Sequence, residues 1–363
     1  MRTNQDQPLV SVVVKCLNEA ANLGRCLRSL TAEVLDRGYE AEIILADSIS
    51  TDGSVEVARG FDVTVVQLAD VADRRCGAAG HLGWQYARGQ FLLLIDGDQE
   101  LLPAFLEAAL AAMRGDDRLA AVSGGLTEMS DGIEYQERQA RPDPSRRPGL
   151  VDHVTGCALY RTAAVQEAGH FMDRNLHCFE EFELGLRLRA RGWRLRMLDV
   201  PCIRHYGHRD ASARLLLRRW RTRFLMGYGE LLRGAWGQPY FWQALRPCRL
   251  ALLAILWWGV SLGLAAAAAL GSGSVPDALL ALAGAAALPF MALLARKRSL
   301  ERAGYAWLML QLSAAALLVG LFLKRVAPAA PLAAVVLQDA RAADAGRRPL
   351  RAERQDPNIA RSE

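Results

Sequence analysis

The first hundred residues alternate between short apolar runs and segments with helical spacing. Four apolar runs without strict polar alternation are typical of inner parallel strands, covered on both faces. They are residues 9–14, 43–46, 63–66 and 91–95. Asn18 is a suitable N-cap for a helix after the first run, and further helices are expected over residues 77–88 and from Pro103 onward. Strands and helices in such short units predict an α/β fold, with a doubly wound, Rossmann-like, mostly parallel sheet flanked by helices.

The C-terminal third contains long uncharged apolar stretches. They cover residues 250–270, 278–295 and 303–323, the second being interrupted by Pro289. A helix needs about 20 apolar residues to cross a bilayer core, so each stretch is a candidate transmembrane helix. Core helices of a soluble protein are the alternative. Hydrophobic residues make up 52% of the chain and are concentrated here, which favours two to three transmembrane helices.

Residues 211–236 predict one amphipathic helix between these two parts. Trp220 and Phe224 lie on an apolar face, and arginines crowd the other faces. Such a helix either lies on an anionic membrane surface or covers a soluble domain. Cationic residues 296–298 indicate a cytoplasmic return after the second stretch, but a third crossing would place the arginine-rich tail outside, against the positive-inside rule. Either the third stretch is re-entrant or residues 326–338 turn back.

These patterns divide the chain into four parts. They are an α/β domain over residues 1–209, a basic interface helix over 210–246, membrane helices over 247–325, and an arginine-rich tail over 326–363 that is expected to be disordered. The polar opening carries no secretory signal, so the α/β domain is expected in the cytoplasm, at the inner (plasma) membrane. Seven cysteines without a Cys-x-x-Cys pair argue against a zinc or redox site, and with a net charge of only +5 no nucleic-acid partner is expected.

Two acids, Asp96 and Asp98, directly follow the apolar run at residues 91–95. Ligands of open α/β sheets bind just beyond the carboxyl ends of such strands. Two carboxylates at that edge can hold a divalent cation, which in turn binds a diphosphate. An alternative is that these acids only cap the following helix. The pair makes a sugar-nucleotide enzyme the first hypothesis.

Residues from about 9 to 210 also contain several short motifs in a fixed order. These are residues 16–19 (CLNE), 47–54 (DSISTDGS), 87–89 (ARG), 96–98 (DGD), 155–161 (TGCALYR) and 180–188 (EEFELGLRL). In composition, order and spacing they resemble glycosyltransferase family 2, whose members have the GT-A fold. The Asp-Gly-Asp segment is similar to the Asp-x-Asp metal motif of that family.

The resemblance implies a donor site for a nucleotide sugar and a divalent metal, Mn or Mg. It implies that Asp98 contacts the metal, that Asp96 contacts the metal or the ribose, and that Asp47 contacts the nucleobase or ribose. The other residues that it suggests for the donor site are Asn18, Glu19 and Arg75. His205 is a further candidate for the metal shell, with a structural, hydrogen-bonded histidine as the alternative.

Glu180 and Glu181 form a second acidic pair, at the start of a helix that is expected to end before Gly192. The helix dipole favours ionised carboxylates in a first turn, and an inverting transfer needs an ionised base to accept the proton of the acceptor hydroxyl. The resemblance implies that the base is Glu181, although a glutamate stands where the family usually has aspartate, so Glu180 remains a rival. The chain also departs from the family at Ser48, usually an acid, and at residues 80–83 (GHLG), usually Arg-Asn-x-Gly.

Together these features predict a membrane-associated, metal-dependent, inverting glycosyltransferase of hexosyltransferase type. Its expected acceptor is a lipid-linked or cell-envelope glycan, because the membrane anchor favours an acceptor at the bilayer. One alternative is a catalytically inactive membrane scaffold with the same fold. A nicotinamide-dependent oxidoreductase is the other, but no Gly-x-Gly-x-x-Gly follows the first strand.

Overall fold

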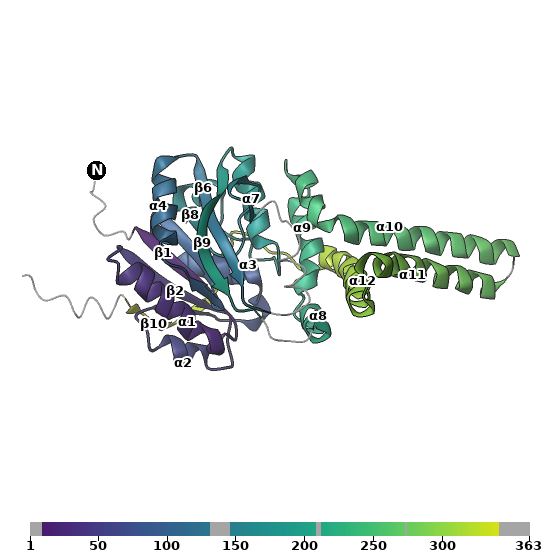
Figure 1. The fold of residues 1–363 in the computed structure, drawn as a ribbon, viewed down its shortest axis with the longest axis horizontal. Helices are drawn as coiled ribbons and strands as arrows, with labels where there is room; N and C mark the ends of the chain where they lie inside the picture. Colours follow the sequence, from purple (N-terminus) through teal and green to yellow (C-terminus); the bar gives the residue numbers. More distant parts are fainter. Residues whose placement is uncertain (1–8, 131–145, 208–211, 273, 341–363) are drawn as a thin grey trace, which may run out of the picture.

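The computed structural model describes residues 9–130, 146–207, 212–272 and 274–340. An α/β body lies at one end and long helices project from it (Figure 1). The body is built on a 10-stranded sheet of order β10-β3-β2-β1-β4-β8-β6-β9-β5, with β7 paired to β9. The expected α/β class is confirmed.

The half of the sheet that the sequence predicts is parallel. Its strands are β1 (Val10–Cys16), β2 (Ala41–Asp47), β3 (Thr64–Leu68) and β4 (Phe91–Asp96). Alternate side chains of β1 enter two separate cores, with Val12 and Val14 in one and Val13 in the other. Both faces of these strands are therefore buried, which explains why their apolar runs show no alternation.

The other half of the sheet is mixed. Its strands are β5 (Gln99–Leu101), β6 (Leu119–Glu128), β7 (Gly149–Val151), β8 (Ala158–Arg161) and β9 (Arg194–His205). Strand β8 runs antiparallel to both β4 and β6, whereas β9 runs parallel to β6. The short β5 pairs antiparallel with the end of β9, which brings Gln99 opposite His205 and carries the acid turn that precedes β5 to this edge.

Helices cover both faces of the sheet. They are α1 (Ala20–Leu30), a π-helical turn (Thr31–Leu35), α2 (Ser54–Ala58), a 3₁₀ turn (Val71–Asp73), α3 (Cys76–Tyr86), α4 (Phe105–Gly115), α6 (Thr162–Glu167) and α7 (Glu180–Ala190). The helix expected from Pro103 starts two residues later, after Ala104 in a left-handed conformation (φ 66°). Gly192, with φ 83°, follows α7 as expected from the sequence.

The amphipathic segment is not the single helix that its spacing predicts. It forms α8 (Ser212–Arg221), a 3₁₀ turn (Phe224–Met226) and α9 (Gly227–Ala235). Arg223 adopts a left-handed backbone (φ 61°), which interrupts the helix and changes its direction. Leu216 and Met226 of this segment pack against Ala316, so its apolar side faces another helix of the protein.

Three helices are long and apolar enough to cross a membrane: α10 (Phe241–Ser272), α11 (Val275–Lys297) and α12 (Leu300–Phe322). Their positions confirm the three expected stretches. After α12 the chain returns to the body, where β10 (Ala334–Gln338) pairs antiparallel with β3. The expected disordered tail is therefore wrong for this segment, because the return strand completes the edge of the sheet. Residues 341–363, which hold the arginines of the tail, lie outside the described residues, as does His208.

Candidate active site

The candidate site lies at the carboxyl edge of the parallel strands and centres on a buried lysine. Lys15 of β1 lies next to Asp96 of β4 in the parallel register. Its Nζ is 3.0 Å from Asp96 Oδ1 and 3.2 Å from Glu180 Oε1. The first acid of the Asp-Gly-Asp turn and the first acid of α7 are thus joined through one cation. The two acidic motifs, distant in sequence, belong to one site.

Asp98, the second acid of the turn, faces the end of β9. Its Oδ2 is 3.3 Å from Nε2 of His205, and Nδ1 of His205 is 2.8 Å from Oε2 of Glu128. Burial would lower the pKa of His205, but its bonds with Asp98 and Glu128 outweigh burial and raise that pKa to about 10. His205 is therefore an imidazolium between two carboxylates here. A protonated ring cannot ligate a metal, so the metal role suggested by the sequence requires loss of that proton.

Glu19 brings a further carboxylate to the acid turn. A Cβ on Gly97 would lie 3.3 Å from the Cβ and Cγ of Glu19, so the glycine allows the two segments to approach. Burial and the charges of Asp98 and Asp96 raise the pKa of Glu19 to about 8. Glu19 was expected in the donor site, and its position is beside the two acids of the turn.

These carboxylates suit a hard divalent cation. Within the described residues, no group of three or more metal-ligating side chains is already arranged around one point. Mg²⁺ and similar ions, however, are commonly held by one or two carboxylates, with water and substrate phosphates completing the shell. Burial and the charges of neighbouring acids raise the pKa values of Glu19 and Asp96, in the case of Asp96 against the effect of Lys15, so a bound cation would stabilise their ionised forms. Asp98 and Asp96, with Glu19 nearby, are the residues that would hold it.

The two glutamates of α7 have different surroundings. Glu180 is buried (8% exposed) and paired with Lys15. Glu181 is more exposed and accepts a hydrogen bond from the backbone N–H of Gly156 at 3.2 Å. Burial and the charges of Glu180 and Asp96, opposed by Lys15, raise the pKa of Glu181 to about 8. Of the pair, Glu181 has the geometry and the proton affinity of a general base.

Asp47 does not lie open to a ligand. Its side chain is fully buried, and its two oxygens accept hydrogen bonds from the Ser50 hydroxyl (2.5 Å), the Ser50 N–H (3.0 Å) and Gln67 Nε2 (2.8 Å). The expected contact of Asp47 with a nucleobase or ribose stays a prediction, and these three bonds leave little of the carboxylate's acceptor capacity for it. The acid fixes the loop after β2.

Asn18 likewise joins two loops. Its Oδ1 accepts the N–H of Thr51 at 2.8 Å, and Glu19 occupies the N-cap position expected for Asn18. The first N–H groups of α1 are satisfied by side chains from the second loop: Ala20 N–H donates to Asp52 (2.9 Å) and Glu19 N–H to Ser54 (2.9 Å). Asp52 therefore acts as a helix-capping residue. Its target includes α1, which only the tertiary structure could reveal.

Arg75 lies at the N-cap of α3, with Nη1 donating to the carbonyl of Ala72 (3.1 Å) and 3.7 Å from Asp73. Arg74 instead holds the loop after β2, by donating to the carbonyls of Ser48 (2.8 Å) and Ile49 (2.6 Å). Arg75, with its side chain 19% exposed, remains the arginine of this pair that a donor phosphate would reach.

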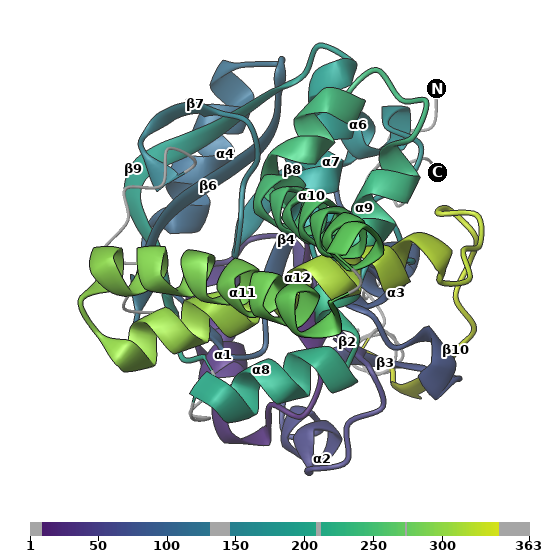
Figure 2. The ribbon, with the colours of Figure 1, turned by 90° about the vertical axis from the view of Figure 1, so that its right-hand side faces the viewer.

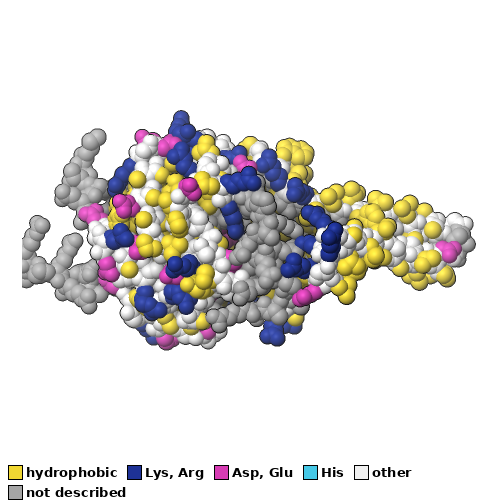
Figure 3. Space-filling model, viewed as in Figure 1, with side chains coloured by type: hydrophobic (Ala, Val, Ile, Leu, Met, Phe, Trp, Pro, Cys, Tyr) yellow, Lys and Arg dark blue, Asp and Glu magenta, His cyan; other side chains and the backbone are white. Residues whose placement is uncertain are grey.

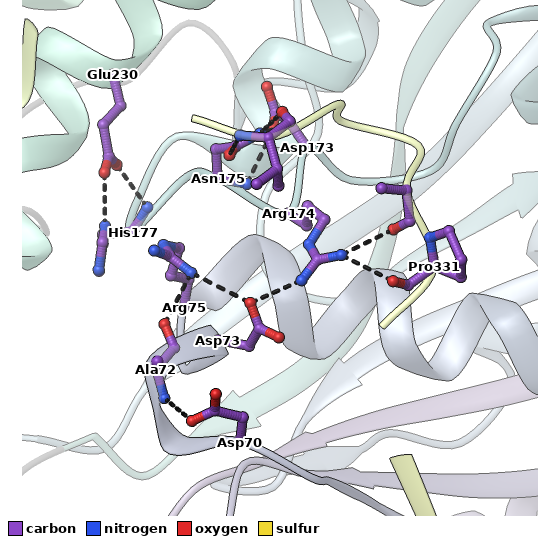
Figure 4. A network of polar contacts seen from close by, with 12 residues as sticks. Asp70, Ala72, Asp73, Arg75, Asp173, Arg174, Asn175, His177, Glu230 and Pro331 are labelled. Atoms are coloured by element: carbon purple, nitrogen blue, oxygen red, sulfur yellow. Dashed lines mark hydrogen bonds and ion pairs between the residues drawn. The ribbon is translucent and has the colours of Figure 1, made fainter. Parts of the chain in front are cut away.

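The loop before α7 is held from behind by a polar network (Figure 4). His177 donates its backbone N–H to Glu230 of α9 at 2.9 Å, and its Nδ1 lies 2.8 Å from the same carboxylate. Arg174 binds Asp73 at 2.6 Å and the carbonyl of Pro331 at 2.8 Å. Helix α7, which carries Glu180 and Glu181, is thus positioned by contacts with α9 and with the segment that follows α12.

The family model for glycosyl transferase family 2 matches residues 11–169. Residues 11–169 of this chain thus match a glycosyltransferase family 2 domain. The described fold also resembles that of the mannosyltransferase PcManGT from Pyrobaculum calidifontis, solved in complex with GDP-Man and Mn²⁺. The TM-score is 0.53 at 20% identity over 88% of each chain. The GT-A fold expected from the sequence is confirmed.

Two curated relatives each match less than half of this chain. Glycosyltransferase AglE of Haloferax volcanii is 31% identical over 111 residues, which are 30% of this chain and 36% of that protein. The undecaprenyl-phosphate 4-deoxy-4-formamido-L-arabinose transferase of Pseudomonas aeruginosa is 30% identical over 169 residues, 44% of this chain and 48% of that protein. The chain therefore spans less than half the length of these relatives.

Sequence reasoning on the family 2 domain missed three contributors to the site. Lys15 directly follows the predicted first strand (residues 9–14) and was not singled out, although a lysine at the end of a buried apolar run is a signal. Glu128 is the last residue of β6. It could not be recognised from the sequence as a partner of His205, because their contact depends on the β6–β9 register. Gly156 contributes only its backbone N–H, which no side-chain motif reveals.

Proposed function

We propose that this chain is a membrane-associated, metal-dependent and inverting glycosyltransferase that transfers a sugar from a nucleoside-diphosphate sugar to a lipid-linked or cell-envelope glycan. The observation that carries the proposal is that Lys15 joins Asp96 of the Asp-Gly-Asp turn to Glu180, the neighbour of Glu181, at one sheet edge, beside the segment that matches the family 2 model. The solved relative with GDP-Man and Mn²⁺ supports the donor and the metal. The relative named for undecaprenyl phosphate supports a lipid acceptor.

In the proposed reaction Glu181 accepts the proton of an acceptor hydroxyl, whose oxygen attacks the anomeric carbon. The bond from that carbon to the diphosphate breaks, and its electron pair leaves with the nucleoside diphosphate. A divalent cation held by Asp98 and Asp96 would neutralise charge on that leaving group. Lys15 keeps Asp96 and Glu180 in place, and Arg75 is available to the donor phosphates.

A base is needed only where the attacking oxygen carries a proton. A lipid phosphate is already ionised near neutral pH, whereas a glycan hydroxyl is not. The position and proton affinity of Glu181 therefore favour a hydroxyl of a lipid-linked glycan over a bare lipid phosphate.

We further propose that the body faces the cytoplasm at the inner membrane. The cationic residues beside the long helices are Arg246, Arg249, Arg296, Lys297 and Arg298. They occur at the ends of α10 and α11 that meet the body, as the positive-inside rule requires for a cytoplasmic body. Figure 3 shows Lys and Arg side chains gathered at this junction, and hydrophobic side chains covering the projecting helices.

The test is release of nucleoside diphosphate from a panel of sugar nucleotides by the full chain in detergent, with and without Mn²⁺ or Mg²⁺ and with membrane-lipid extract as acceptor source. We expect metal-dependent release that Asp98→Ala and Glu181→Gln each reduce at least a hundredfold, whereas Glu107→Gln, the same change at an exposed site of α4, leaves it unchanged. Full turnover by both variants refutes the mechanism. No turnover by the wild type, together with rescue of a deletion strain by Asp98→Ala, would support the inactive scaffold.

A further inference from the structure

The chain leaves the α/β body once, at α10, and returns to it after α12. Strand β10 pairs with β3, with Val335 opposite Gln67 and Val336 opposite Val66. Leu332, just before this strand, is 4% exposed and belongs to the core of the body. A strand of one sheet cannot lie across a membrane from its neighbour. The segment between the two attachments must therefore cross the bilayer an even number of times.

The whole return segment is bound to the body, so the argument does not depend on one edge strand. Arg325 contacts Asp173 at 2.8 Å, and Val326 donates its N–H to Asn175 at 2.9 Å. Leu332 exchanges two hydrogen bonds with Gln85, at 2.7 and 3.2 Å. Because these contacts begin at residue 325, α12 ends on the side of the body.

Helices α10 and α11 have the features of a crossing pair. They pack together and project away from the body (Figure 1), and α11 has no buried residue in its whole length. With 23 residues, α11 is about 34 Å long at 1.5 Å per residue, enough for a hydrocarbon core of about 30 Å. Between residues 250 and 295 the one charged residue is Asp277, in the first turn of α11. The indole of Trp257 bonds the carbonyl of Ala285 at 3.0 Å and joins the two helices.

Helix α12 is equally long and apolar, but it is docked on the body. A Cβ on Gly320 would lie 2.1 Å from the carbonyl oxygen of Met226, and one on Gly229 would lie 2.1 Å from that of Leu317. The backbones of α9 and α12 therefore touch through a pair of glycines. Figure 2 looks nearly along α10, whereas α12 runs across the view.

The charges at the two ends of α12 agree with this orientation. Arg296, Lys297, Arg298 and Arg302 surround its start, and Lys324 follows its end, next to Arg325, which is paired with Asp173. A crossing helix would carry one of these clusters to the far side of the membrane. A helix along the surface keeps both clusters at the headgroups on the side of the body, where anionic lipids attract them.

We infer that α10 and α11 are a two-crossing transmembrane hairpin, and that α12 is not a third span but lies along the bilayer surface beneath the body, as a lipid-binding face. The inference rests on the membrane attachment proposed above and is independent of the chemistry. It places the end of the chain on the same side as the active site, which removes the conflict of the arginine-rich tail with the positive-inside rule.

Cysteine labelling in sealed membrane vesicles tests the arrangement. The native thiols are buried except that of Cys76, so the unmodified chain sets the background. Two matched reporters are Gly115→Cys in the body and Gly271→Cys at the tip of the hairpin, where an added Cβ meets nothing within 4 Å in either case. Glu301→Cys and Val335→Cys report on the start of α12 and on β10.

An impermeant maleimide applied to vesicles with the body outward should label the reporters at 115, 301 and 335 at least tenfold faster than that at 271. Detergent should equalise them. Protection of the reporter at position 335 would mean three crossings, and protection of that at 301 would mean that α11 does not cross. Rapid labelling of the reporter at 271 would mean that the hairpin does not cross. Each of these results overturns the inference. Absence of the chain from salt-washed membranes would instead refute the proposed attachment.

Depth measurements test α12 itself. Leu308 and Leu318 are 42% and 46% exposed and ten residues apart on this helix. Spin labels at both positions should report the same depth from oxygen and nickel accessibility if α12 lies along the surface. A crossing α12 would separate them by about 15 Å in depth, and that result would refute the surface orientation.

Discussion

Glu181 offers the sharpest test of the proposed chemistry, because its ionisation should set the pH dependence of turnover. Its pKa is raised to about 8 by burial and by the charges of Glu180 and Asp96, against the effect of Lys15. A general base acts only when ionised. With a pKa of about 8, roughly half of the enzyme is active at pH 8, about a tenth at pH 7 and about a hundredth at pH 6.

Two neighbouring substitutions should move this profile in opposite directions. Glu180→Gln removes a charge that raises the pKa of Glu181, so the rise in activity should shift to lower pH. Lys15→Met removes a charge that lowers that pKa, so the rise should shift to higher pH. The direction of each pKa shift follows from the charge that the substitution removes. A purely structural defect is not expected to shift the pH profile.

The assay is kcat/KM for release of nucleoside diphosphate between pH 6 and 9, at saturating metal and constant ionic strength. The log–log plot for the wild type should rise with unit slope to about pH 8 and then level off. Glu181→Gln should lose the slope together with most of the activity. A flat profile, or shifts of Glu180→Gln and Lys15→Met in the same direction, would refute the assignment of Glu181 as the base.

The other predictions concern stability and charge within the described contacts. Lys15→Met should destabilise the fold by about 2–3 kcal/mol, because breaking a buried ion pair leaves carboxylates without a counter-charge, measured by thermal unfolding in detergent. Gly320→Leu should lower the unfolding midpoint and expose α12 to protease, since a Cβ there meets backbone at 2.1 Å, whereas Gly304→Leu, in open space on the same helix, should not. Glu128→Gln should lower the pKa of His205, because it removes a hydrogen-bonding carboxylate, and NMR titration of labelled histidine should show no change if their contact is absent.

The parallel half of the sheet could be predicted because each of its strands is a local apolar run with both faces buried. The same is true of the three long helices, whose length and lack of charge are local properties. The Asp96–Asp98 turn was found because a strand that ends in acids is a local pattern with a known place in the fold.

Other features depend on contacts between distant segments. The helical spacing of apolar residues over 211–236 predicts one helix. In the structure the segment packs on α12 and is broken at Arg223. Asp47 has the sequence context of a ligand-binding acid, and only the structure shows that Gln67 on β3 also donates a hydrogen bond to it. The role of Lys15 depends on the β1–β4 register and on the position of α7. No pattern along the chain reveals either of them.

Strand β10 also constrains the order in which the protein is made. Val66 must remain without its partner, Val336, until 270 further residues have been synthesised and the hairpin has entered the membrane. During that time the edge of β3 is an unpaired strand, open to association with other chains. Completion of the sheet can therefore follow only correct membrane insertion, and a chain whose hairpin fails to insert is left with an exposed edge that quality-control proteases and chaperones can recognise.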